Sequence, residues 1–481
     1  MKKYEAVIGL EIHAELNTES KIYCECKNGF GYNANTQICP ICMGMPGTLP
    51  VLNKKVVDYA IKMGHALNCK INNSCRQDRK NYFYPDLPKG YQISQSDIPL
   101  CENGYLDIMV NDSKKTIGIT RIHIEEDAGK LLHDNSVSGS LVDFNRCGVP
   151  LIEIVSEPDL RSSSEAKIFL ETIKSILQYI NISDCKMQEG SIRCDVNVSV
   201  REQGTGVLGT RCEMKNINSF SGAVRCIEYE IKRQISILEA GEKIIQETRR
   251  WDDTNGISIT MRTKENANDY RFFPEPDLNT IVIDEKRVDE LKTTIPELPN
   301  VKIFRYVEDL GLSSTDAAFI AFSKDKAQLF DDCIKLGRCS PKNISNKILS
   351  DVSKYINETG KSISNTNLTA EKLVSLIEEI ENGRISNTSA TLVFNIIMNE
   401  DKSVSEIIEE KGFIQNSNED YLCELAKNVI SENEKSVNDY RNGKKNALGF
   451  LVGQCMKKSK GKANPVKINE IILKFLSDGG C

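Results

Sequence analysis

Charged and histidine side chains take every second position in four short stretches of the sequence. Residues i and i+2 of a β-strand share a face, so each stretch predicts a strand with one polar and one apolar face. The polar sets are Glu11, His13 and Glu15; Arg121, His123 and Glu125; Arg193, Asp195, Asn197 and Ser199; and Arg211, Glu213 and Lys215. Any one of these strands alone would fit an antiparallel sheet whose polar face is simply solvated.

The residue types on these polar faces favour chemistry over simple solvation. They are mainly Asp, Glu, His and Arg, whereas an ordinary exterior strand carries Thr, Lys and Ser. Carboxylates and an imidazole that converge on a sheet face suit a hard divalent cation, above all Mg²⁺, left partly hydrated for phosphate groups. Neighbouring arginines suit an anionic substrate. If the four strands are neighbours, the sequence predicts a Mg²⁺ site that handles phosphates.

Four cysteines near the N-terminus have the spacing of a metal knuckle. Cys24-x-Cys26 is followed, after twelve residues, by Cys39-x₂-Cys42. This pattern is compatible with a structural Zn²⁺ held by four thiolates, although the first pair is closer than usual. The alternative is four buried thiols in a reducing compartment, where disulfides do not persist.

Two segments combine aromatic, basic and turn-forming residues. Residues 79–92 read RKNYFYPDLPKGYQ, and residues 269–277 read DYRFFPEPD. Loops with this composition can line a pocket or stack on nucleotide bases, including the terminal adenosine of a tRNA. A packed Ω-loop is the alternative interpretation.

The elements that would position these side chains follow from the hydrophobic periodicity. Residues 1–292 alternate with the period of strands, interrupted by helical patterns at 162–180 and 221–241, the second with Gly241 as its expected C′ residue. Pro296 and Pro299 mark residues 293–300 as a linker. The helical period then continues to the C-terminus, with a polar break at 399–405.

Size and composition complete the expected organisation. The chain has 481 residues, 40% hydrophobic and 27% charged residues, and a net charge of −6, which is typical of a globular protein of about three domains. We predict an α+β fold with a mixed or antiparallel β-rich cradle (1–292), a helical domain (293–404) and a small helical tail domain (405–481). The first residues match neither a signal nor a transit peptide, so a cytoplasmic location is expected.

The tail contains a run in which all charged residues are basic. From Arg441 to Lys467 there are eight basic residues and no Asp or Glu. They are Arg441, Lys444, Lys445, Lys457, Lys458, Lys460, Lys462 and Lys467. A solvated helical face is one interpretation; contact with the phosphates of a tRNA body is the one we favour, because the excess is wholly positive.

Familiar nucleotide-binding motifs are absent from the sequence. There is no P-loop, no Rossmann glycine fingerprint and no protein-kinase signature. If this chain handles ATP, it does so on a fold outside those classes.

Several long motifs resemble the B subunit family of the bacterial tRNA-dependent amidotransferases. The resemblance extends over almost the whole chain. The motifs are the GLEIH of residues 9–13, the CPxCxGxPGxLP of 39–50, residues 79–92, the TRxHxEEDAGK of 120–130, the DxNRxGxPLxEI of 143–154, the GSxRxDxNVS of 190–199, the MRxKE of 261–265 and the GKANP of 461–465.

This resemblance implies a ligase that works within an A–B–C heterotrimer. In that family the A subunit is a glutaminase, and ammonia passes from it to the B subunit. The B subunit uses ATP and Mg²⁺ to phosphorylate the side-chain carboxylate of misacylated Glu-tRNA(Gln) or Asp-tRNA(Asn), and ammonia then displaces the phosphate. The small C subunit holds the A and B subunits together. Which of the two tRNAs is used in the cell does not follow from the sequence.

Particular residues are expected to carry this chemistry. We assign Glu11, His13, Glu125, Asp195 and Glu213 to Mg²⁺, and Cys24, Cys26, Cys39 and Cys42 to Zn²⁺. Arg193, Lys89 and Lys215 are the expected contacts to phosphate or substrate anions. Tyr82, together with Lys89 and Arg193, is expected to contact ATP.

Two other functions remain open at this stage. A non-catalytic scaffold subunit that binds tRNA would leave the acidic strand faces merely solvated. A metal-dependent hydrolase that works alone would use the Glu11 and His13 face without partner subunits. ATP turnover that depends on Mg²⁺ and on misacylated tRNA separates these functions from the amidotransferase.

Overall fold

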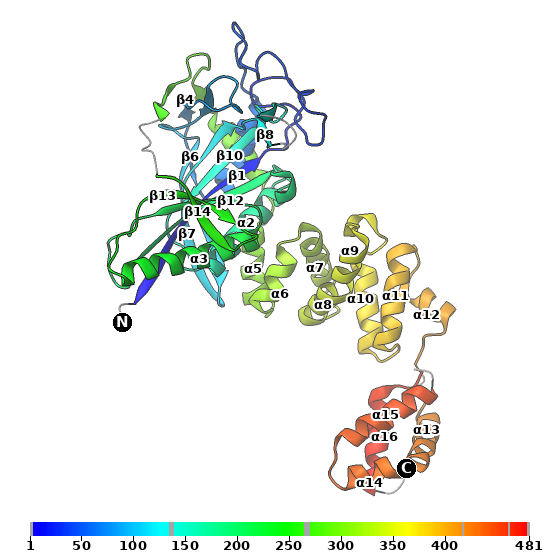
Figure 1. Cartoon of the computed structure of the whole chain (residues 1–481). Helices are drawn as coiled ribbons and strands as arrows, with labels where there is room; N and C mark the ends of the chain where they lie inside the picture. Colours follow the sequence, from blue (N-terminus) through cyan, green and yellow to red (C-terminus); the bar gives the residue numbers. More distant parts are fainter. Residues whose placement is uncertain (1–2, 134–138, 264–269, 416–417, 460–461, 479–481) are drawn as a thin grey trace. The chain divides into compact units, whose positions relative to one another are not determined.

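Strands fill the first part of the chain and helices the second (Figure 1). The computed structural model describes residues 3–133, 139–263, 270–415, 418–459 and 462–478. The chain divides into two compact units, residues 1–305 and 306–481. The first unit combines a mixed sheet with helices, and the described part of the second is helical, so the predicted α+β class is confirmed.

A nine-stranded sheet forms the centre of the first unit. Its strand order is β14-β13-β12-β11-β1-β10-β7-β6-β2, antiparallel throughout except for the parallel pair β12 and β13. The strands are β1 (Tyr4–Glu15), β2 (Lys70–Ile71), β6 (Cys101–Val110), β7 (Ser113–Glu126), β10 (Pro150–Ser156), β11 (Ile192–Glu202), β12 (Cys212–Ile217), β13 (Glu247–Asp252) and β14 (Ile257–Thr263). All four stretches predicted from their alternation thus end up in one sheet, on or beside β1, β7, β11 and β12.

Three helices cover the apolar face of this sheet. Leu10, Ile12 and Ala14 of β1 are fully buried in a core shared with α1 (Lys54–Ala66), α2 (Ser163–Tyr179) and α3 (Phe220–Glu239). The last two are the helices predicted from periodicity, and serine side chains cap both of their N-termini. Gly241 has a φ of +78°, as a C′ glycine requires. The alternate residues of β1, including Glu11 and His13, therefore lie on the opposite face of the sheet.

The strand register aligns the polar residues into rows across that face. His13 lies opposite Glu153 of β10 and opposite Arg193 of β11. Glu153 in turn lies opposite His123 of β7. One row therefore runs from His123 through Glu153 and His13 to Arg193, and a neighbouring row places Glu11 opposite Asp195.

Short strands join the two aromatic segments predicted separately. Phe273 of β15 pairs with Arg79 of β4, so strands from the two segments meet in one small sheet of the order β15-β4-β5. The remaining elements of this unit are β3 (Ser74–Cys75), β4 (Asp78–Asn81), β5 (Tyr91–Ser94), β8 (Lys130–His133), β9 (Ser140–Asp143), η1 (Met187–Glu189), β15 (Phe273–Pro274), β16 (Ile281–Val282) and α4 (Glu285–Thr293).

From residue 299 on, the secondary-structure elements among the described residues are all helices. They are α5 (Pro299–Glu308), α6 (Ser314–Ala321), α7 (Lys324–Leu336), α8 (Pro341–Lys347), η3 (Ile348–Val352), α9 (Ser353–Thr359), η4 (Ile363–Asn365), α10 (Ala370–Glu381), α11 (Asn387–Asn399), α12 (Val404–Lys411), α13 (Glu419–Glu432), α14 (Glu434–Arg441), α15 (Asn446–Lys458) and α16 (Pro465–Asp478). The predicted linker is shorter than expected, because Pro299 starts α5, a position that proline tolerates.

Two groups of helices are visible in the second unit. α12 packs on α10 and α11, whereas α13 to α16 share a core of their own that includes Leu422, Leu451 and Ile472. The division into three domains at residues 292 and 404 stays a prediction. None of the helices that the structure describes combines the length and apolar character needed to cross a lipid bilayer.

Candidate functional site

A cavity of about 430 Å³ opens on the polar face of the sheet. Side chains from the strands β1, β7, β10, β11 and β12 line it, together with residues of the two aromatic segments. The charged, histidine and aromatic lining residues are Glu11, His13, Lys80, Arg121, His123, Glu153, Asp195, Arg211, Glu213, Lys215, Tyr270 and Phe272.

His13, Glu125 and Glu153 form the first cluster of candidate metal ligands. One donor atom from each lies within 4.8 Å of the others. The Nε2 atom of His13 is 3.2 Å from Glu153 Oε2 and 3.6 Å from Glu125 Oε1. Cross-strand register produces this proximity, since β10 places Glu153 between His13 and His123. The cluster offers carboxylate oxygens and one imidazole, a donor set that a divalent cation accepts.

The carboxylates of this cluster and the two histidines beside them, His13 and His123, stabilise each other's charges. Burial disfavours the charged form of His123, yet the carboxylates of Glu153 and Glu125 raise its pKa to about 9. Burial likewise disfavours ionised Glu153, but the two histidines hold its pKa well below the usual range. The carboxylates of Glu153 and Glu125 also outweigh burial at His13 and raise its pKa, whereas a bound cation would require its neutral form.

Glu11, Asp195 and Glu213 form the second cluster, also with donor atoms within 4.8 Å of one another. Burial and the three acidic neighbours Glu153, Glu213 and Asp195 raise the pKa of Glu11. Lys215 partly neutralises the group, with its Nζ atom 2.5 Å from Asp195 Oδ2 and 3.4 Å from Glu213 Oε1. Asn197 and Thr248 donate hydrogen bonds to Glu11 and Glu213, which orients both carboxylates.

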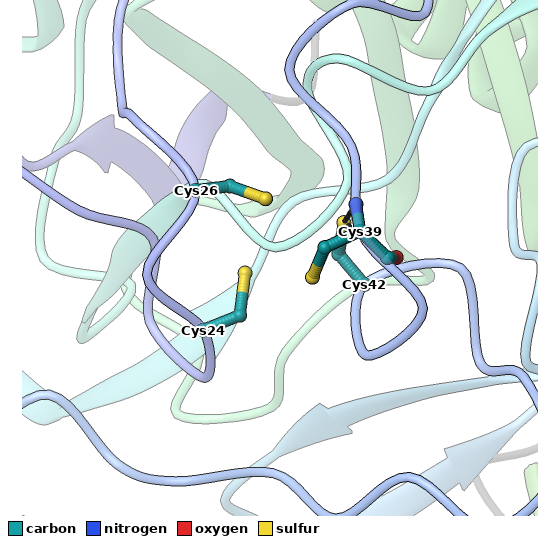
Figure 2. Close-up of side chains that lie close together, drawn as sticks. All are labelled: Cys24, Cys26, Cys39 and Cys42. Atoms are coloured by element: carbon teal, nitrogen blue, oxygen red, sulfur yellow. Dashed lines mark hydrogen bonds between the residues drawn. The ribbon is translucent and has the colours of Figure 1, made fainter.

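The four predicted cysteine ligands also meet in the structure (Figure 2). Cys24 and Cys26 come from one segment and Cys39 and Cys42 from another, with all four sulfur atoms within 4.8 Å of one another. The backbone N–H of Cys39 donates to Cys42 Sγ at 3.1 Å, and the Nζ atom of the fully buried Lys21 is 3.9 Å from the same sulfur. Donors of this kind stabilise a thiolate, so the donor set fits a tetrahedral Zn²⁺.

Comparison with known proteins shows which family carries these features. The family model of the GatB/GatE catalytic domain matches residues 6–289, and that of the GatB domain matches residues 328–476. The chain belongs to the GatB family of tRNA-dependent amidotransferase subunits.

Curated relatives cover nearly the full length of the chain. A protein of Caldicellulosiruptor bescii is 57% identical, with 98% of each chain covered. One of Thermoanaerobacter pseudethanolicus is 56% identical, with 99% of this chain and 100% of the relative covered, and one of Clostridium tetani is 52% identical, with 98% of each covered. All three carry the name of the B subunit of the aspartyl/glutamyl-tRNA(Asn/Gln) amidotransferase. The resemblance inferred from the motifs is therefore confirmed.

The structure of this GatB family member brings the five predicted Mg²⁺ ligands to one sheet face, but in two clusters. Glu11, Asp195 and Glu213 form one, and His13 and Glu125 belong to the other. Glu153, the third member of the second cluster, was not among the residues assigned from the sequence. Its neighbours on the same face of β10 are Leu151 and Val155, so no polar alternation marks this strand.

The three cations predicted to contact anions all have carboxylate partners within the chain. Arg193 Nη2 lies 2.5 Å from Asp127 Oδ2, Lys89 pairs with Glu126, and Lys215 pairs with Asp195. Lys89 lines a separate cavity beside Cys24 and Cys42, so the structure does not bring it to the two acidic clusters. Neither Lys89 nor Arg193 lines the 430 Å³ cavity. Sequence spacing gave no indication of these internal pairs.

Tyr82, the predicted ATP contact, does not line the cavity itself but lies next to Tyr270, which does. Its ring centroid is 6.1 Å from that of Tyr270, which is again 6.1 Å from Phe272. Tyr270 and Phe272 line the cavity, whereas Tyr82 does not. The two aromatic segments thus build one wall of the candidate site.

Two lysines of the basic run in the tail have acidic partners in the structure. Lys444 pairs with Asp439 of α14, and Lys458 pairs with Glu432 of α13, both outside the run. Lys460 lies outside the described residues, as do Gly461 and the residues Lys264 and Glu265 of the 261–265 motif.

Proposed function

We propose that this chain carries the ATP-dependent step of a tRNA-dependent amidotransferase. It phosphorylates the side-chain carboxylate of Glu-tRNA(Gln), Asp-tRNA(Asn) or both, and ammonia then displaces the phosphate to give the amide. The main support is the presence of two acidic clusters at one cavity, which five of their six residues line. Phosphoryl transfer depends chiefly on positioning and on neutralisation of charge. The names of the relatives agree with this substrate class.

Activation is required because a carboxylate is a poor electrophile with a poor leaving group. One carboxylate oxygen attacks the γ-phosphorus of ATP, ADP leaves, and the resulting acyl phosphate carries a good leaving group. The nitrogen of ammonia attacks the carbonyl carbon and phosphate departs with the former carboxylate oxygen. His13, Glu125 and Glu153 would hold one Mg²⁺ and Glu11, Asp195 and Glu213 a second. Bound Mg²⁺ would neutralise the charge of the phosphate oxygens.

Three further assignments belong to this proposal. A glutaminase A subunit supplies the ammonia and a small C subunit completes the heterotrimer. A structural Zn²⁺ is held by Cys24, Cys26, Cys39 and Cys42. The tail helices α13 to α16 bind the body of the tRNA through their remaining basic residues.

The test is amidation by the complete heterotrimer on both misacylated tRNAs. We expect amide formation that requires ATP, Mg²⁺ and glutamine. A complex that binds misacylated tRNA but hydrolyses no ATP in its presence would instead support the non-catalytic scaffold. Activity of the isolated chain without partners would support the lone hydrolase.

A further inference from the structure

Three basic side chains at the cavity differ from the cations assigned from the sequence. Lys80 of β4, Arg121 of β7 and Arg211, directly before β12, all line the cavity. Within the described part of the chain, none of the three forms an ion pair or a side-chain hydrogen bond. Their positive charge is therefore available to a ligand, whereas Arg193, Lys89 and Lys215 are already neutralised by Asp127, Glu126 and Asp195.

Their positions place positive charge on both sides of the two acidic clusters. Arg121 and Arg211 belong to the β7 and β12 sides of the cavity, and the strands β10, β1 and β11 lie between them. Four strand spacings separate the backbones of β7 and β12 by roughly 19 Å, and the long side chains of both arginines line the cavity between them. Four of the six residues of the acidic clusters lie on these three strands, with Glu125 on β7 and Glu213 on β12, so a ligand held between the arginines would pass over the candidate metal ligands.

Lys80 connects this basic pair to the aromatic wall. Its Nζ atom lies 5.0 Å from the ring centroid of Tyr270, which also lines the cavity. An ammonium beside an aromatic face can hold a phosphate while a planar base stacks on the neighbouring rings. The planar guanidinium of arginine can bind two phosphate oxygens at once.

We infer that Lys80, Arg121 and Arg211 are the residues that contact the phosphate groups of ATP, in place of Arg193, Lys89 and Lys215. The inference rests on the proposed function, since it specifies how the same cavity holds its nucleotide. The carboxylates alone would repel a triphosphate, so cations with free charge at the cavity are needed in addition to Mg²⁺.

Binding measurements on the complete heterotrimer test this inference. Calorimetry with ATP·Mg²⁺, with tripolyphosphate and with adenosine compares the wild type with Lys80→Gln, Arg121→Gln and Arg211→Gln. Lys232→Gln, which removes one exposed charge from α3 away from the cavity, is the matched control. Arg121→Lys keeps the positive charge but loses the planar guanidinium group. Mn²⁺ titration reports whether the acidic clusters are intact in each variant.

We expect each Gln variant to weaken ATP and tripolyphosphate binding roughly tenfold, because a hydrogen bond between charged groups contributes about that factor. The affinities for adenosine and Mn²⁺ should stay unchanged in every variant. Lys232→Gln should bind ATP with wild-type affinity, and the affinity of Arg121→Lys for ATP should lie between those of the wild type and Arg121→Gln. Wild-type affinity for ATP in all three Gln variants would overturn the inference and leave the proposed function standing. A wild-type complex that amidates tRNA without binding ATP would overturn both.

Discussion

Glu153 lies directly opposite His13 in the β1–β10 pairing, with Glu153 Oε2 3.2 Å from His13 Nε2. The same carboxylate oxygen is 3.4 Å from Nε2 of His123 on the other neighbouring strand. One acidic side chain thus joins the polar faces of three adjacent strands, and it stands at the centre of the candidate metal site.

Loss of Glu153 should therefore abolish amidation. We expect Glu153→Gln, like Glu125→Ala and Asp195→Ala, to lower the amidation rate by about 100-fold or more, because a metal ion supplies several kcal/mol of transition-state stabilisation. Glutaminase activity of the complex should persist, since that chemistry belongs to another chain. Glu239→Gln on the exposed surface of α3 serves as the control. Folded Glu153→Gln protein that amidates at the wild-type rate would remove this residue from the site.

Zinc is expected at one ion per chain. Elemental analysis of protein purified without added metal should find it, and Cys39→Ser or Cys42→Ser should remove it, because the four sulfur atoms already lie close together. Cys423→Ser, in α13, should retain zinc. Absence of stoichiometric zinc from the wild-type protein would refute the assignment.

Glu15 is expected to make the stability of the chain depend on pH. Burial and the nearby Asp127 raise its pKa from 4.5 to about 8. Between these values the folded chain holds a proton that the unfolded chain has lost, so this carboxyl makes folding less favourable as the pH rises. Glu15→Gln should therefore raise the thermal midpoint relative to the wild type more at pH 8 than at pH 5. An equal difference at both pH values would contradict this effect.

Binding of tRNA should lose part of its salt dependence when tail lysines without an ion pair among the described residues are replaced. We expect the triple change of Lys445, Lys457 and Lys462 to Gln to reduce the slope of log Kd against log salt by about 2 to 3, since each phosphate contact contributes roughly 0.7 to 0.9. Changing Lys232, Lys243 and Lys286 to Gln removes the same charge from the first unit and should leave the slope unchanged. An unaltered slope in the tail variant would show that these lysines are merely solvated.

The sequence predicted the polar strand faces better than the contacts between them. Alternation alone identified Glu11, His13, Glu125, Asp195 and Glu213, because a strand fixes which residues share a face. It gave no strand order and no register, and these decide that the five residues form two clusters. Glu153 was not assigned to the metal because its neighbours on the same strand face, Leu151 and Val155, are apolar.

The partners of lysine and arginine side chains could not be predicted from the sequence either. Spacing indicates which face a lysine or arginine occupies, but not whether an acidic partner lies within reach. Arg193 is paired with Asp127, sixty-six positions away in the sequence, whereas Arg121 on a similar strand is left without an ion pair among the described residues. Only the folded arrangement separates these two cases.

The most direct test follows one oxygen atom. Glu-tRNA(Gln) or Asp-tRNA(Asn) with ¹⁸O in the side-chain carboxylate is amidated by the complete heterotrimer with ATP, Mg²⁺ and glutamine, and the released phosphate is analysed by mass spectrometry. Activation as an acyl phosphate predicts that each amide formed releases one phosphate bearing one ¹⁸O atom from the carboxylate. Amide formation that releases only unlabelled phosphate would contradict the proposed phosphorylation of the carboxylate.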